Sequence, residues 1–281
     1  MTGRRTRISL AAWSVLVIAF LWIPIVIIAL YAFNGSTIQG WPITNWTTHW
    51  FGVAWHDPDV RGAFELSLKV GAIATAIALV LGTMAAAAVA RYRFFGRDAV
   101  SFLLVLPLAL PGIITAMALV SFFSFAGISA SIWTIVIGHA TFCVVVVYNN
   151  VVARLRRSSA SLIEASQDLG ADGWQTFRFV LWPVLSTALV AGGLLAFALS
   201  FDEVIVTTFT AGAQQTLPIF ILDNIRQGQE LPVINVVAFF VIVVTVIPVA
   251  LAQRVMRDTG VIRRGAAEVT EAVEAAEIPA V

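Results

Sequence analysis

The chain has 281 residues, of which 59% are hydrophobic and only 12% are charged, and its mean hydropathy is +0.92. These values lie outside the range of soluble domains and predict a polytopic membrane protein. The formal net charge of +1 predicts no surface for nucleic acid.

Six apolar stretches approach or exceed the length of a membrane-crossing helix, which is about 20 residues for roughly 30 Å of hydrocarbon. We expect all six to be α-helical, because lipid offers no partner to unpaired backbone groups. The predicted fold is an all-α membrane domain over 10–264, after a cytoplasmic N-terminus at 1–9 and before a flexible acidic tail at 265–281. The predicted spans are 10–33, 64–90, 99–125, 131–152, 184–208 and 232–252.

The basic residues predict the orientation of these spans. Four segments hold 14 of the 17 lysines and arginines: the N-terminus, the loop after the second span, the loop after the fourth span, and the segment after the sixth. The positive-inside rule assigns all four to the cytoplasm. An even number of spans agrees, so we expect both termini and the loop 153–183 to be cytoplasmic.

Two segments before that loop interrupt the simple pattern. The third predicted span contains Pro107, Pro111 and Gly112, and either a kink beside a pathway or a kink due to packing alone explains them. The first outer loop is rich in tryptophan, which is typical of an interfacial belt. Membrane anchoring is the favoured interpretation of this loop, and contact with an external partner is the alternative. Its tryptophans are Trp41, Trp46, Trp50 and Trp55.

A strongly polar block follows the fourth span, at 161–183. Its pattern predicts two short helices joined at a glycine, because capping boxes start helices and a left-handed glycine ends them. A membrane protein that builds such a cytoplasmic block is expected to dock a partner there. The capping signals are Ser161 with Glu164, then Gly170, then Asp172 with Gln175.

The sequence contains no motif for nucleotide hydrolysis. Lys69 is the only lysine. It does not follow a glycine and no Ser or Thr comes directly after it, which excludes a phosphate-binding loop. The three histidines, His49, His56 and His139, have no ligand-like spacing, so we predict no catalytic residue and no metal site. We expect His139, inside the fourth span, to bridge helices.

The polar block also carries a family pattern. Glu164-Ala165-Ser166 is followed by Gly170, Val180 and Pro183 at the spacing Glu-Ala-Ala, three residues, Gly, nine residues, Ile-x-Leu-Pro. This resembles the cytoplasmic motif in permease subunits of type I ATP-binding-cassette importers. The chain departs from the motif at Ser166 for Ala, Val180 for Ile and Trp182 for Leu.

The resemblance implies the fold of these permeases, with a coupling helix that fits a cleft on an ATPase subunit. It implies ATP and Mg in a partner ATPase dimer and no cofactor in this chain. A second homologous permease, an extracytoplasmic substrate-binding protein and membrane lipid are the other implied partners, in the bacterial cytoplasmic membrane. The residues assigned to ATPase coupling are Ser161, Glu164, Ala165, Ser166, Asp168 and Gly170.

The resemblance is closest to the second permease of spermidine/putrescine importers. Ferric-iron, thiamine and phosphonate permeases share much of the pattern, so these cargoes stay open. A self-sufficient secondary carrier is the alternative class, and it predicts broken helices or ion-coupling carboxylates in both halves. The matching segments are 200–204, 216–218, 226–228 and 232–235.

Asp202 and Glu203 form a compact acidic pair near the end of the fifth span. A carboxylate at the centre of a span costs about 2.5–3.5 kcal/mol, which calls for a compensating partner. One interpretation is an acidic lining for a cationic cargo; the other is pairing with Arg226 or with the companion permease. Aromatic faces can add cation–π contacts, with core packing as the alternative. The aromatic candidates for the path are Phe201, Tyr148 and Trp133.

Overall fold

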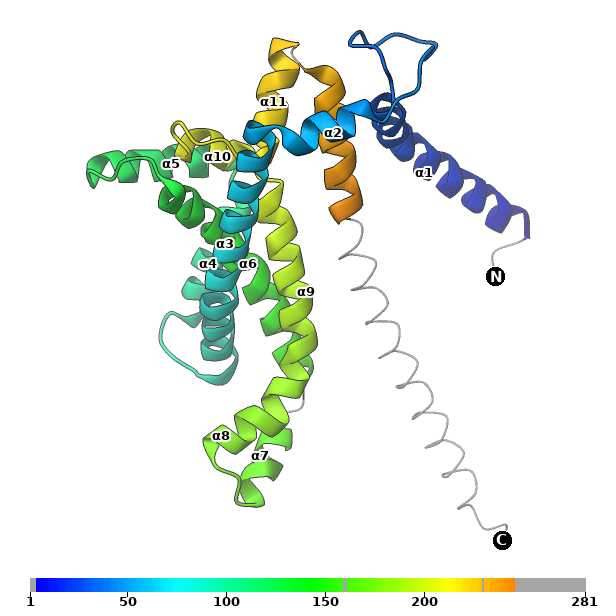
Figure 1. Cartoon of the computed structure of the whole chain (residues 1–281). Helices are drawn as coiled ribbons and strands as arrows, with labels where there is room; N and C mark the ends of the chain where they lie inside the picture. The colour runs from blue at the N-terminus through cyan, green and yellow to red at the C-terminus, as the bar shows by residue number, and fades with distance from the viewer. Residues whose placement is uncertain (1–3, 159–160, 229, 246–281) are drawn as a thin grey trace. The chain divides into compact units, whose positions relative to one another are not determined.

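The computed structural model describes residues 4–158, 161–228 and 230–245, and the packing given below lies within residues 4–240. The regular elements of these described residues are helices (Figure 1). Four helices are long and apolar enough to cross a membrane, at Ile8–Ala32, Pro58–Arg91, Ile132–Arg157 and Gly173–Phe201. The predicted all-α class is confirmed. The predicted sixth span is described only as the shorter apolar helix Leu231–Thr245, and the tail at 265–281 lies outside the described residues.

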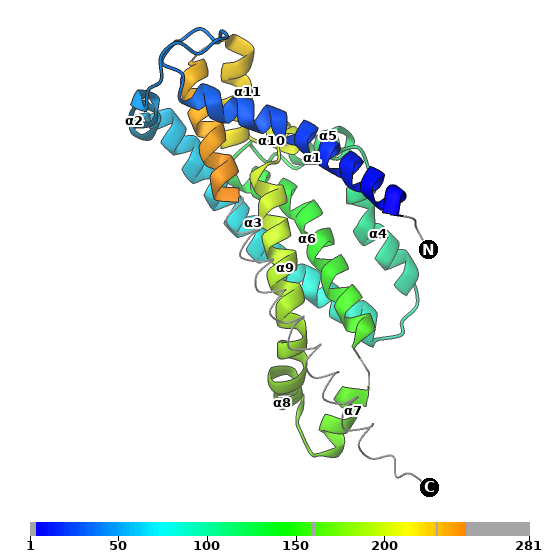
Figure 2. The ribbon, with the colours of Figure 1, turned by 90° about the vertical axis from the view of Figure 1, so that its right-hand side faces the viewer.

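Three of the long helices form the core of the molecule. The helices α3 (Pro58–Arg91), α6 (Ile132–Arg157) and α9 (Trp182–Phe201) pack against one another. In Figures 1 and 2 they run side by side. Small residues permit this close approach. A side chain on Gly82 of α3 would meet the Val144 carbonyl oxygen of α6 at 2.8 Å, so the absence of a side chain lets these two helices approach each other.

The third predicted span is not one straight helix. Its two parts, α4 (Arg97–Ala109) and α5 (Gly112–Phe125), meet at an angle of 106°. Leu110 has an extended backbone and Pro111 stands at the start of α5. Proline lacks an amide donor and disfavours a helical residue before it, so the helix ends there. The interruption expected in the predicted span 99–125 is therefore confirmed, and it is a sharp bend between two separate helices.

The fifth predicted span also has different limits. A continuous helical run begins at Gly173 with α8 (Gly173–Gln175), passes through the π-helical turn η1 (Thr176–Leu181), and ends with α9 at Phe201. The chain then leaves the helix at Asp202 and starts a separate short helix, α10 (Ile205–Thr210). The predicted range 184–208 is wrong at both ends, because capping residues mark real helix limits that apolarity alone does not.

The loop predicted to be the first outer one contains a helix that the sequence pattern did not indicate, α2 (His49–His56). The Trp50 indole donates to the Asn34 carbonyl oxygen at 3.0 Å, and the Phe33 ring lies 5.0 Å from that of Phe51. These contacts fold the segment after α1 (Arg4–Ala32) onto α2. Trp41, Trp46 and Trp55 remain exposed, which suits an interfacial belt.

Two groups of short helices lie at opposite ends of the core. The short helices α7 (Ser161–Asp168) and α8 stand at one end of α3, α6 and α9. At the other end stand α2, α10 and α11 (Leu217–Gln227), as Figures 1 and 2 show. The run Gly173–Phe201 extends from the α7 end to the α10 end, as does α6.

Candidate coupling loop and substrate path

The polar block folds as its capping signals predict. After α7, Gly170 adopts φ +82°, and the amides of Leu169, Gly170 and Ala171 donate back to carbonyls of α7 at 2.8–3.1 Å. This left-handed glycine closes the helix. Asp172 and Gln175 exchange hydrogen bonds of 2.7 and 2.9 Å, a complete capping box that starts α8. The first short helix, the glycine junction and the helix start after Asp172 are confirmed, but the second predicted short helix is only the beginning of the run Gly173–Phe201.

The coupling candidates do not all face outward. Glu164, Ala165 and Asp168 are exposed on α7, whereas Ser166 is half-buried. Its hydroxyl donates to the Ile163 carbonyl oxygen at 2.7 Å and lies 3.0 Å from the Thr176 hydroxyl. Thr176 is buried at the start of η1. The Ser166 side chain therefore holds α7 to the start of the helical run that becomes α9, and its role in coupling stays a prediction.

The outer surface of the loop is unusually apolar. Leu162, Leu169, Trp174 and Phe179 are exposed, and Leu169 retains 88% of its accessible surface. The Trp174 and Phe177 rings lie 5.7 Å apart. Exposed apolar side chains on one short loop are typical of an interaction surface.

A second group of polar residues surrounds the junction between α9 and α10. Glu203 is half-buried, and its Oε1 accepts a hydrogen bond of 2.9 Å from the Val206 amide, which caps α10. Asp202 is exposed, and none of the described residues gives its carboxylate a hydrogen bond or an ion pair. Among the described residues neither carboxylate pairs with Arg226. The two acidic residues therefore differ: one holds the backbone and the other presents its charge.

His139 of α6 binds both sides of this junction. Its Nδ1 lies 2.8 Å from the Ser200 hydroxyl of α9, and its Nε2 lies 2.8 Å from the Thr207 hydroxyl of α10. All three residues are buried. The expectation that His139 bridges helices is confirmed. Its two partners carried no recognisable pattern in the sequence, because they lie 61 and 68 residues away.

The two breaks in the predicted spans meet at α10. This helix packs on α5 and α6. A side chain on Gly112, at the start of α5, would lie 3.8 Å from Ile205, whereas one on Gly138 of α6 would meet Val206 at 2.7 Å. Only glycine fits at position 138, so α10 lies directly against α6. Helix breaks that face each other inside a membrane bundle are a known setting for transport sites.

The aromatic path candidates are not gathered around Asp202. Tyr148 is buried in the core, and its hydroxyl donates to Ser101 at 3.1 Å. Phe201 is buried and its ring packs 5.9 Å from that of Phe197. Trp133 is exposed at the start of α6. The structure thus assigns Tyr148 and Phe201 to packing and leaves Trp133 as the aromatic candidate with a free face.

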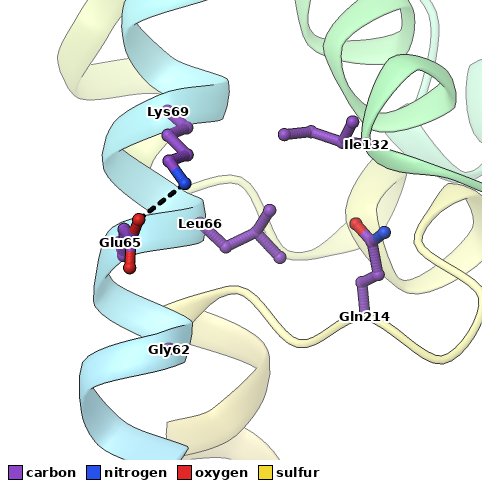
Figure 3. Close-up of a pocket in the computed structure, with 6 residues that line it drawn as sticks. All are labelled: Gly62, Glu65, Leu66, Lys69, Ile132 and Gln214. Atoms are coloured by element: carbon purple, nitrogen blue, oxygen red, sulfur yellow. Dashed lines mark ion pairs between the residues drawn. The ribbon is translucent and has the colours of Figure 1, made fainter.

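A pocket of about 310 Å³ opens near the same end of the molecule (Figure 3). In it, Glu65 and Lys69 of α3 form an ion pair of 2.6 Å, which Figure 3 marks. Both side chains are largely exposed, so the pair adds little stability. Because the two charges compensate each other, the pocket offers no net attraction to a cation. The lining residues are Gly62, Glu65, Leu66, Lys69, Ile132 and Gln214.

Comparisons with known proteins agree with this architecture. The family described as binding-protein-dependent transport system inner membrane component matches residues 78–258. The spermidine/putrescine transport system permease protein PotC of Escherichia coli K12 is 31% identical over 262 residues, which cover 92% of this chain and 96% of PotC. The putrescine transport system permease protein PotI of the same strain is 34% identical over 233 residues, which cover 79% of this chain and 82% of PotI.

Solved structures show the same fold. A chain of a bacterial ABC transporter that imports the acidic polysaccharide alginate has a TM-score of 0.66 at 18% identity, covering 92% of this chain and 98% of that one. A chain of the MetNI methionine ABC transporter has a TM-score of 0.57 at 19% identity, and the match covers 73% of this chain and 97% of that one. The chain belongs to the family of inner membrane components of binding-protein-dependent transport systems.

Proposed function

We propose that this chain is a permease subunit of an ATP-driven importer that carries polyamines across the bacterial cytoplasmic membrane. The observation that carries the proposal is the exposed Asp202 carboxylate at a helix break, in a chain whose relatives PotC and PotI are named for spermidine and putrescine transport. The cargo enters as a flexible chain with several ammonium groups. A path for such a cargo needs negative charge that no protein cation neutralises.

Asp202 meets this requirement. An ammonium group that leaves water loses several kcal/mol of hydration unless a charged partner replaces it. Since none of the described residues pairs with Asp202, its charge is available to the cargo. Glu203 contributes differently, because its carboxylate holds the first turn of α10 and so fixes the backbone beside Asp202.

Energy enters from partners, since the chain has no phosphate-binding loop. In the proposed assembly, a cytoplasmic ATPase dimer binds ATP and Mg and docks on the exposed face of α7, with Glu164 and Asp168 near its centre. The proposed orientation has both termini and the loop 153–183 in the cytoplasm. A second permease and an external binding protein complete the assembly.

The helical run Gly173–Phe201 supports a direct connection between the docking loop and the cargo path. Ser166 and Thr176 tie α7 to the start of this run. Near its middle, the Arg154 guanidinium of α6 donates to the Val184 carbonyl oxygen at 2.9 Å. A movement of α7 imposed by the ATPases therefore reaches Asp202 through packed helix, as rigid-body motion.

Reconstitution of the complete complex in proteoliposomes tests the cargo. We expect its ATPase activity to rise when its binding protein is loaded with spermidine or putrescine, and to stay at the basal level with a phosphonate. Stimulation by the phosphonate alone, without a response to polyamine, would overturn the polyamine proposal. Uptake by this chain without any ATPase subunit would overturn the importer mechanism.

A further inference from the structure

Three buried side chains form a hydrogen-bonded bridge across the α9–α10 break. His139 is 1% exposed, and the Ser200 and Thr207 hydroxyls each lie 2.8 Å from one of its ring nitrogens. Ser200 stands before the break and Thr207 after it. One rigid imidazole on α6 therefore sets the separation of two backbone segments that the chain itself does not hold as one helix.

The direction of these hydrogen bonds follows from the number of available protons. The Thr207 hydroxyl donates its single proton to the Glu203 carbonyl oxygen at 2.7 Å. It must therefore accept from the Nε2–H of His139, and in a neutral ring Nδ1 then accepts from the Ser200 hydroxyl. The bridge runs in one direction from Ser200 to the Glu203 backbone with each proton used once, which favours a single geometry.

The two ends of the bridge are not equally important. Before the break, α9 is also held to α6 by the Cys143 thiol, which donates to the Ala196 carbonyl oxygen at 3.3 Å. After the break, Thr134 of α6 donates to the Thr210 carbonyl oxygen at 2.8 Å, which holds only the far end of α10. The first turn of α10, next to Asp202, packs on Gly138 of α6 through Val206, and its hydrogen bond to α6 is the one between Thr207 and His139.

We propose that His139 is a positioning residue for transport: through Thr207 it fixes the angle at the α9–α10 break and so aims the Asp202 carboxylate at the cargo. This inference rests on the proposed function, in which Asp202 meets a polyamine. His139 itself does not touch the cargo, because it is buried in the core. Its contribution is the orientation of a neighbouring charge.

Side-chain length separates this role from simple packing. Asparagine reaches only as far as the Nδ1 position, so His139→Asn keeps the Ser200 bond and loses the Thr207 bond. Glutamine reaches the Nε2 position, so His139→Gln keeps the Thr207 bond. We expect His139→Asn and Thr207→Val to raise the KM for spermidine uptake about tenfold, as for one lost buried hydrogen bond, with Vmax little changed.

The matched control is Cys143→Ala, one turn further along α6. Cys143 is fully buried, and its thiol bonds to α9 at Ala196, before the break. We expect Cys143→Ala to leave the KM for spermidine uptake unchanged. We expect the same unchanged KM for His139→Gln and for Ser200→Ala. If His139→Asn and His139→Gln raise the KM equally, the ring acts through its volume and the proposal is wrong.

A second measurement does not depend on the cargo. Cys143 is the only cysteine, so Thr208→Cys in the Cys143→Ala background gives one thiol on the exposed side of α10. We expect a maleimide to label it about tenfold faster in the purified complex when Thr207→Val or His139→Asn is added. Unchanged labelling would overturn the positioning role, whatever the uptake shows. If labelling changes while Asp202→Asn transports normally, His139 positions α10, but Asp202 does not bind the cargo. That result would overturn both the proposed role of Asp202 and the proposal that His139 orients its carboxylate for transport.

Discussion

The α7 loop and the α9–α10 junction stand at opposite ends of one helical run and hold their polar groups in different ways. In the loop, the capping partners lie three residues apart and the side chains are exposed. At the junction, the partners of His139 lie more than 60 residues away and are buried. The loop is therefore a local structure whose face is free for a partner, whereas the junction is held by the tertiary core.

The largest effect is expected at the junction, where the two adjacent carboxylates can be compared directly. Asp202→Asn removes the unpaired charge, and we expect polyamine uptake to fall about 10- to 100-fold, the range for a lost charged interaction. Glu203→Gln is the matched control, because an amide oxygen still accepts from the Val206 amide. Radiolabelled spermidine uptake checks both variants. Equal loss in the two would show that their different geometry does not matter for transport.

The next largest effect is expected in the loop, where two glycines differ only in backbone conformation. Gly170 has φ +82° and open space around its Cα, so Gly170→Ala is strained without a steric clash. The left-handed conformation costs an alanine about 1–2 kcal/mol, and we expect roughly tenfold weaker binding of the ATPase subunits. Gly173→Ala, at the first turn of α8 with equally open space, is the control. Titration of purified ATPase onto the permease measures both, and equal affinities would contradict the role of the left-handed turn.

A smaller effect is expected where the loop joins the helical run. Ser166→Ala and Thr176→Val each remove one side of the 3.0 Å contact, which is worth about 1 kcal/mol. We expect each variant to raise the ATP hydrolysed per spermidine imported a few-fold while the complex still assembles. The double variant should be no worse than either single one, because the partners share one interaction. Additive losses would mean that the two hydroxyls act separately.

The same contrast explains what the sequence could predict. Capping boxes and a left-handed glycine act over three or four residues, so the two loop helices and their junction at Gly170 follow from the pattern. The apolar helical spans follow from the physics of lipid. The inward orientation of Ser166 does not, because it depends on Thr176 ten residues later.

The junction shows where apolar patterns fail. Pro111 indicated an interruption, but the 106° bend accompanies the packing of α5 on α10, which no local pattern indicates. The fifth span was predicted to continue past Phe201 because the residues after Glu203 are apolar again. Glu203 caps α10 over three residues, whereas His139 holds it from 68 residues away, and only this second contact depends on the tertiary fold.

The continuous run from Gly173 to Phe201 has a mechanical consequence. Its 29 residues extend for about 43 Å at 1.5 Å per residue. A rigid rod of that length multiplies small rotations: a tilt of about 5° about one end moves the other by about 4 Å. A carboxylate displaced by that distance passes from direct contact with an ammonium group to separation by a water molecule. A small tilt of the run can thus bring the Asp202 carboxylate into contact with a cation or separate the two.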